Sequence, residues 1–131
     1  MSQVEVGFWR DSHGRIPVRE FVLALKSRDA RAAASCVDLL RMLEEHGNAL
    51  RRPHADYLRE GIYELRLNQH RVQFRLLYFF DGRARAVVTS AFAKTGKVPE
   101  QEIQRALNRR QLYLTAPDRY AYLGPEAWRN L

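Results

Sequence analysis

The chain of 131 residues is 46% hydrophobic and carries a formal net charge of +7 at pH 7. One domain with a packed core is expected at this length, and the positive charge favours an anionic partner, with RNA, DNA or an acidic protein as candidates. A single cysteine excludes an internal disulfide and a cysteine-based metal cluster, and no stretch approaches the ~20 apolar residues that a membrane-spanning helix needs.

The first part of the chain is predicted to form a strand and a pair of helices. Apolar residues alternate over residues 4–9, which indicates a strand. Pro17 suits the first position of a helix, and apolar residues recur after it at helical spacing. Ser27 is expected to cap a second helix, which ends at Gly47 because glycine readily adopts a left-handed conformation. The two helices are expected to form a hairpin that needs a sheet to cover.

Residues 48–60 are predicted to form a basic loop, and three strands follow it. The strands are expected over residues 62–67, 71–80 and 84–92. Asp81 and Gly82 predict a two-residue turn between the last two strands. This turn would place Arg75 opposite Val88 on the same face of the sheet. The more apolar face, which should meet the helix hairpin, would carry Val72, Phe74, Leu76, Tyr78, Phe80, Val87 and Ala91.

A third helix is predicted over residues 99–113, with acidic residues in its first turn and basic residues in its last. The order β-α-α-β-β-β-α predicts an α+β domain, with a mostly antiparallel sheet packed on the helix hairpin. Residues 114–131 contain two prolines and a glycine, yet Tyr120 and Trp128 are too apolar for a solvated tail. This segment is expected to dock on its own domain, on a partner chain or on a neighbouring molecule.

Four cations are predicted to gather at the polar end of the sheet. Arg66 and Arg75 lie in the middle of strands, where a charged side chain needs a specific partner, and Lys94 and Lys97 follow the last strand. Together they indicate a phosphate site. The residues alone leave a second interpretation open, in which Arg75 forms a half-buried structural ion pair with Glu64.

The residues assign no general base. His70 is the only imidazole expected near the four cations, and an exposed turn residue is the alternative interpretation. His13, His46 and His54 lie at turns or at a helix end, without the spacing of metal ligands.

Several short motifs follow one another between residues 5 and 113. They are G-x-I-P-V-x-E-F-V at Gly14–Val22, E-x-G at Glu45–Gly47, G-I-Y-E-L-R at Gly61–Arg66, F-R-L-L-Y-F-F at Phe74–Phe80 and F-x-K-T-x-K-x-P at Phe92–Pro99. In this order and at these spacings, they resemble the HigB/RelE-type toxins of bacterial toxin–antitoxin systems, and most closely the HigB subset of phage-derived proteins. The resemblance implies a toxin domain over residues 1–113 and leaves residues 114–131 as an extension outside it.

Toxins of this type are small α+β domains with a curved sheet, and they inhibit translation by cleaving mRNA, typically within the ribosome. They use no metal or other cofactor, and a helix-turn-helix antitoxin neutralises them. The resemblance therefore implies an endoribonuclease whose partners are mRNA, the ribosome and a HigA-like antitoxin. DNA would be contacted only through the antitoxin complex.

The resemblance assigns catalytic roles to Arg66, Arg75 and Lys94, with Arg75 at the scissile phosphate. RNA contacts are expected from Arg71, Gln73, Phe92 and Lys97, and core packing is the alternative role of Phe92. Two residues depart from the pattern. Glu64 stands where some relatives have a basic residue, and Val98 stands where many have a helix-capping threonine.

Two other functions stay open from the sequence: a basic RNA- or protein-binding module without activity, and an interaction protein that mainly grips an antitoxin helix. Arg31, Arg41, Arg51 and Arg52 are expected to form solvated basic surface or to contact phosphates of ribosomal RNA. The N-terminus lacks the pattern of a signal peptide, so we expect a soluble, cytoplasmic protein. We also expect Arg75→Ala and Lys94→Ala to abolish cleavage in a chain that remains folded.

Overall fold

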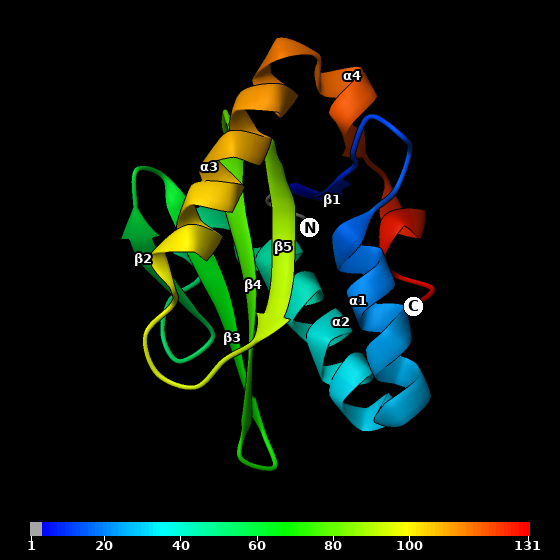
Figure 1. Cartoon of the computed structure of the whole chain (residues 1–131), viewed down its shortest axis with the longest axis vertical. Helices are drawn as coiled ribbons and strands as arrows, with labels where there is room; N and C mark the ends of the chain where they lie inside the picture. The colour runs from blue at the N-terminus through cyan, green and yellow to red at the C-terminus, as the bar shows by residue number, and fades with distance from the viewer. Residues whose placement is uncertain (1–3) are drawn as a thin grey trace.

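A six-stranded sheet separates two layers of helix in the computed structural model, which describes residues 4–131 (Figure 1). Helices α1 (Pro17–Arg28) and α2 (Ala30–His46) cover one face, and helix α3 (Glu100–Thr115) covers the other. The prediction of an α+β domain, with its sheet packed on a helix hairpin, is confirmed.

The strand order is β2-β3-β4-β5-β1-β6. The strands are β1 (Glu5–Trp9), β2 (Ala55–Arg59), β3 (Ile62–Gln69), β4 (Val72–Asp81), β5 (Arg85–Ala93) and β6 (Ala121–Tyr122). The helix hairpin carries the chain from β1 to the far edge of the sheet, and an antiparallel meander from β2 to β5 brings it back. Strands β1 and β5 therefore run parallel, whereas the other neighbouring strands run antiparallel.

The helix hairpin forms because each helix carries its apolar residues in one stripe. Pro17 occupies the first position of α1, as predicted. The turn between the helices differs from the prediction, because α1 continues through Arg28 and Asp29 caps α2 in place of Ser27. The Asp29 carboxylate accepts a hydrogen bond from the N–H of Ala32 at 3.0 Å, whereas the Ser27 hydroxyl donates back into α1.

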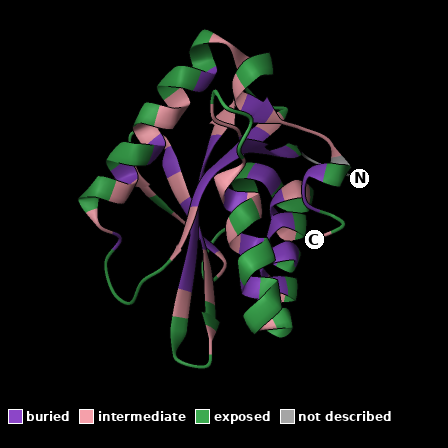
Figure 2. Cartoon of the chain, turned by 45° about the vertical axis from the view of Figure 1, so that its right-hand side comes forward, coloured by how far each residue is buried: buried purple, intermediate pink, exposed green. Residues whose placement is uncertain are grey.

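Two apolar cores lie on opposite faces of the sheet. The core beneath α1 and α2 includes Phe8, Leu40 and Leu76, and the core beneath α3 includes Phe79 and Tyr113. Figure 2 shows the buried residues along the central strands and the exposed residues on the outer sides of the helices. Each fully buried side chain of this size contributes about 1.5–3 kcal/mol, so both faces of the sheet must stay covered.

The predicted pairing of β4 with β5 is wrong. The turn between them contains three residues, Gly82–Ala84, and Asp81 pairs with Arg85. The register shifts again at Thr89, an additional residue in β5 that forms a β-bulge. Arg109 of α3 donates to the carbonyl oxygen of Thr89 at 2.7 Å, so a side chain from another layer provides a partner at the bulge.

The bulge changes which residues face each helix layer. Arg75 lies opposite Phe92 rather than Val88. Val87 packs beneath α3, and Val88 packs beneath the helix hairpin, which is the reverse of the prediction for Val87. The face assigned to Ala91 is correct, because this residue lies beyond the bulge.

The predicted loop over residues 48–60 is wrong in its second half, because Ala55–Arg59 form the edge strand β2. The first part contains a short helix, η1 (Gly47–Ala49). Strand β2 lacks the apolar alternation of a half-buried strand, and its Tyr57 is 53% exposed. Polar and charged side chains are common on edge strands, because they discourage pairing with other chains.

The C-terminal residues dock on their own domain, one of the three alternatives left open above. They contain the short helices α4 (Pro117–Tyr120) and η2 (Pro125–Ala127), and β6 pairs with β1. Trp128 is fully buried in the core beneath the helix hairpin, and its Nε1 donates to the carbonyl oxygen of Val6 at 3.0 Å. Within residues 4–131, none of the helices is long and apolar enough to cross a membrane.

Candidate functional site

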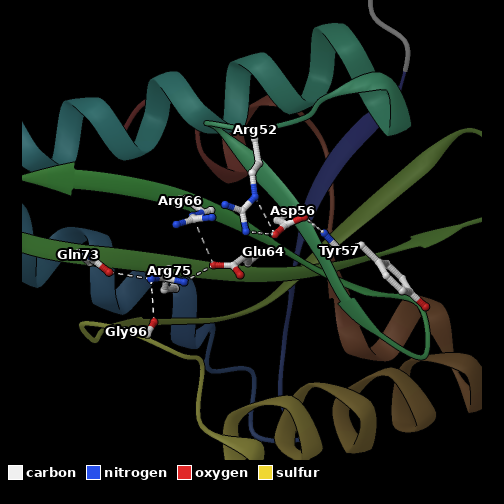
Figure 3. A network of polar contacts seen from close by, with 8 residues as sticks. All are labelled: Arg52, Asp56, Tyr57, Glu64, Arg66, Gln73, Arg75 and Gly96. Carbon is white, nitrogen blue, oxygen red and sulfur yellow. Dashed lines mark hydrogen bonds and ion pairs between the residues drawn. The ribbon is translucent and has the colours of Figure 1, made fainter.

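Glu64 of β3 lies between two of the predicted site arginines, as Figure 3 shows. Arg66 and Arg75 are directly opposite each other on β3 and β4, where like charges repel. Glu64 shares their face of the sheet. Its Oε1 forms an ion pair with Nη1 of Arg75 and lies 4.0 Å from Nε of Arg66. One carboxylate therefore offsets the repulsion between the two guanidinium groups.

The guanidinium of Arg75 is surrounded by acceptors, and the residue is only 5% exposed. Besides the Glu64 carboxylate, it meets Oε1 of Gln73 at 2.7 Å and the carbonyl oxygen of Gly96 at 3.0 Å, both through Nη2. The ion pair between Arg75 and Glu64, which the sequence left as a second interpretation, is therefore present. A phosphate must therefore compete with these three acceptors for the guanidinium of Arg75.

Arg66 is the more accessible arginine, with 26% of its side chain exposed. Its backbone N–H donates to the carbonyl oxygen of His54 at 2.8 Å, just before β2 begins. Both residues also line a cavity of about 310 Å³ between α2 and β3. The segment that carries His54 therefore passes directly beside Arg66 at the edge of the sheet.

A second carboxylate, Asp56, lies beside this group and is already paired. Arg52 donates to Oδ2 of Asp56 at 2.7 Å and 3.0 Å. This hydrogen bond lowers the pKa of Asp56, and the charge of Arg66 acts in the same direction. Asp56 therefore stays ionised and matched by Arg52, and it leaves most of the positive charge of Arg66 available.

The loop after β5 carries Lys94 and Lys97, both exposed. Two contacts fix this loop against β4: the N–H of Lys94 donates to the carbonyl oxygen of Gln73 at 2.8 Å, and Gly96 accepts from Arg75. Gly96 has a φ of 77°, a left-handed conformation that glycine adopts without a steric penalty. Val98 is buried beneath α3, which begins without a side-chain cap.

The residues predicted to contact RNA lie in different settings. Gln73 lies two residues before Arg75 on β4, and Phe92 lies opposite Arg75 on β5. Phe92 also packs against the core beneath α3, in agreement with its alternative role. Arg71 lies at the tip of the β3–β4 hairpin, which projects beyond the sheet (Figure 1). The structure thus brings Arg66, Arg75, Gln73 and Phe92 together on one face and holds the lysine loop beside them.

Two residues of this region are more central than the sequence indicates. The sequence gives Glu64 as a departure from the family pattern and as a partner of Arg75, and strand alternation could also place it on the face of both arginines. Nothing in the sequence shows that the segment of His54, before β2, passes beside Arg66. Among the residues from Val4 to the C-terminus, no group of three His, Cys, Asp or Glu side chains could hold a metal ion.

Fold and site together define a small basic α+β protein with an arginine and lysine cluster at one end of an open sheet. The family described as Phage derived protein Gp49-like (DUF891) matches residues 24–111, which include all of these site residues, and the chain belongs to this family. The family is toxin-like and related to RelE and HigB, and it indicates a toxin with an antitoxin partner. No curated protein matches the chain.

Proposed function

We propose that this chain is the toxin of a toxin–antitoxin pair, of the HigB subset, and that it cleaves mRNA within the ribosome without a metal. Besides the family, one observation supports the proposal: Arg66 and Arg75 share a single carboxylate, and Arg75 bonds the loop that carries Lys94 and Lys97. Two arginines that share one carboxylate, beside a loop with two exposed lysines, leave a surplus of positive charge, which favours a phosphate.

Cleavage without a metal uses the 2′-hydroxyl of the RNA as nucleophile. This oxygen attacks the adjacent phosphorus and expels the 5′-oxygen, and negative charge grows on the phosphoryl oxygens in the transition state. Fixed cations stabilise that charge more than the charge of the ground state. We assign this role to Arg66 and Lys94, the accessible cations, and each contact of this kind typically lowers the barrier by about 2.7–4 kcal/mol.

Arg75 has a different place in the proposal, because it is buried. In the free protein it positions Glu64, Gln73 and the lysine loop. When RNA binds, a phosphate replaces the Glu64 carboxylate as the acceptor of Arg75, since both anions offer two oxygens to the planar guanidinium. Arg71, Phe92 and Lys97 then contact the neighbouring RNA, and Gln73 keeps the guanidinium oriented.

We assign the general base to His54. The carbonyl oxygen of His54 accepts a backbone hydrogen bond from Arg66, and both residues line one cavity, so this histidine adjoins the arginine that would hold the RNA phosphate. Histidine is the side chain best suited to transfer protons near neutral pH.

The proposed partners are mRNA in the ribosome and a HigA-like antitoxin with a helix-turn-helix, which contacts DNA in the complex. The burial of Arg75 favours a second candidate function, a basic RNA- or protein-binding module on the same scaffold without cleavage.

Induced expression in bacteria, followed by mapping of mRNA ends, distinguishes the two functions. Cleavage predicts growth arrest and new ends inside translated reading frames, and we expect Lys94→Ala, Arg66→Ala and His54→Ala to remove both effects. Lys26→Ala, which removes an exposed lysine from α1, is the matched control and should keep them. Harmless expression of a folded chain that still binds RNA would favour the binding module, and unchanged cleavage in the three variants would refute the site.

A further inference from the structure

A second concave surface lies on the other face of the sheet from Arg75, beside η1 and the edge strand β2. It consists of two adjoining cavities of about 310 Å³ and 580 Å³, which share Asn48 and Tyr63 in their walls. One extends toward Tyr57 on β2, and the other toward Arg83 in the β4–β5 turn. We call this surface the tyrosine trough.

The trough presents a fixed aromatic ring to solvent. Tyr57 is 53% exposed, but its hydroxyl accepts a hydrogen bond from the N–H of Gly61 at 3.0 Å. The Tyr57 ring lies 5.0 Å from that of Tyr63, at an interplanar angle of 68°, and Tyr63 stacks on Tyr78 at 5.4 Å. Because the ring is held on one side and open on the other, a planar group can stack on it at little entropic cost.

The charges around the trough are positive. Arg51 bonds the carbonyl oxygens of Asn48 and Leu50, and it has no carboxylate partner among residues 4–131. Arg83 is exposed and forms no ion pair within the part of the chain that the structure describes. Asp56 also lines the trough, but Arg52 already pairs with it at 2.7 Å. Each cavity of the trough therefore carries one arginine without a neutralising acid.

We propose that the tyrosine trough binds single-stranded RNA, with a base stacked on Tyr57 and phosphates at Arg51 and Arg83. A fixed aromatic ring in a trough with unpaired cations matches a nucleotide, which joins a flat apolar base to an anion, and such sites accept many sequences. The trough lies across the sheet from Arg66 and Lys94. It therefore adds affinity for RNA whether or not the chain cleaves it.

Fluorescence anisotropy with a short, labelled 2′-O-methyl RNA tests this proposal, because an RNA without free 2′-hydroxyls cannot be cleaved by the proposed mechanism. Tyr57→Leu keeps the bulk but removes the aromatic face, and we expect the Kd to rise about tenfold. Tyr57→Phe retains the ring and should restore most of the affinity. Arg83→Gln should weaken binding and reduce the salt dependence by about 0.7 in the logarithmic slope, as expected for one lost phosphate contact.

Arg28→Gln, which removes an exposed arginine of α1, is the matched control for charge and should change the Kd less than Arg83→Gln. Equal Kd values for wild type, Tyr57→Leu and Arg83→Gln would overturn the proposal. So would variants that lose neutralisation by the antitoxin and bind RNA normally, since the trough would then be a protein interface. Lys94→Ala, measured in parallel for cleavage, separates a failure of the catalytic site from a failure of the trough.

Discussion

The carboxylate of Glu64 determines how much positive charge the arginine cluster presents in the free protein. Arg66 and Arg75 face each other across two strands, and such a pair would repel without an intervening anion. Glu64 removes that repulsion, but it also occupies the place that a phosphate would take at Arg75. The cluster is therefore partly neutralised, and its accessible charge lies on Arg66 and on the two lysines of the loop.

The ion pair between Glu64 and Arg75 gives a prediction about stability. Arg75→Met leaves the Glu64 carboxylate buried and without its main partner, which should lower the free energy of unfolding by about 3–5 kcal/mol. The double variant Arg75→Met with Glu64→Leu should recover most of that loss, because apolar groups of similar volume replace both charges. Urea denaturation checks both values.

This prediction differs from the sequence-based expectation that Arg75→Ala remains folded. An exposed catalytic arginine could be removed at little cost, but a buried one holds a carboxylate and a loop. A double variant less stable than Arg75→Met would contradict the argument. Loss of cleavage in Arg75→Ala is informative only when the variant is shown to be folded at the assay temperature.

The thiol of Cys36 gives a prediction about pH. Burial raises the pKa of Cys36 from its ordinary value of 9.0 to about 12. Below pH 9 both states keep the proton, and above it the unfolded chain loses a proton that the folded chain retains, so stability falls as pH rises toward 12. We expect urea denaturation between about pH 8 and about pH 10 to show a loss that approaches about 1.4 kcal/mol per pH unit.

Cys36→Ala is the control for the thiol, because it removes the titrating group from both states. This variant should be less stable at every pH, since a buried atom is lost, but its stability should fall less steeply above pH 9. An identical slope in wild type and variant would assign the alkaline loss to other groups, such as Tyr113, whose pKa burial also raises.

Helices and strands with a periodic apolar pattern could be predicted from the sequence, whereas features that depend on contacts between distant residues could not. The three long helices and four of the strands follow from apolar spacing. Strand β2 does not, because Asp56 and Arg59 interrupt its pattern and its pairing with β3 stabilises it instead. The bulge at Thr89 depends partly on Arg109, which lies twenty residues further along the chain.

The register error also explains which site residues were placed correctly. The partner of Arg75 moves by four residues, from Val88 to Phe92, and an even shift keeps each side chain on its face. Arg75 and Phe92 were therefore expected on one face, where the structure has them. On the turn side of the bulge the shift is odd, and Val87 changes face.

The tip of the β3–β4 hairpin contains two residues with unfavourable backbone dihedral angles, and one of them, Arg71, is a predicted RNA contact. His70 and Arg71 have φ values of 50° and 71°, in a two-residue turn that favours asparagine and glycine. We expect His70→Asn and Arg71→Gly to raise the free energy of unfolding by about 1 kcal/mol in combination. Arg71→Gly should at the same time weaken RNA binding, whereas His70→Asn alone should not.

Thermal unfolding and anisotropy with the uncleavable RNA measure the two effects separately. Arg83→Gly serves as the control for stability, because Arg83 lies in a turn where its φ is not positive, and glycine there should destabilise the chain. If the hairpin variants gain no stability, the turn is not strained. If Arg71→Gly binds RNA normally, the tip makes no contact with it.

The whole molecule is a sheet covered on both faces, with its β1 edge closed by residues from the C-terminus. The Gp49-like match ends at residue 111, and the tail lies outside it. The tail nevertheless supplies β6 and a tryptophan to the core beneath the helix hairpin. The division into a toxin domain over residues 1–113 and a separate extension stays a prediction about function. Because the two parts pack together, we expect the stability of the domain to depend on the extension.

Trp128 provides the test of that link. Its side chain is fully buried and bonds the backbone of β1, so Trp128→Ala should cost about 3–5 kcal/mol through the cavity it leaves. Leu112→Ala, at a position on α3 that is 43% exposed, is the matched control and should change stability by less than about 0.5 kcal/mol. A chain that ends at residue 115 should lose more than Trp128→Ala, because it also uncovers the edge of β1 and invites aggregation. Urea denaturation and light scattering check these outcomes, and a truncated chain as stable and monodisperse as the full chain would show that the tail is dispensable for folding.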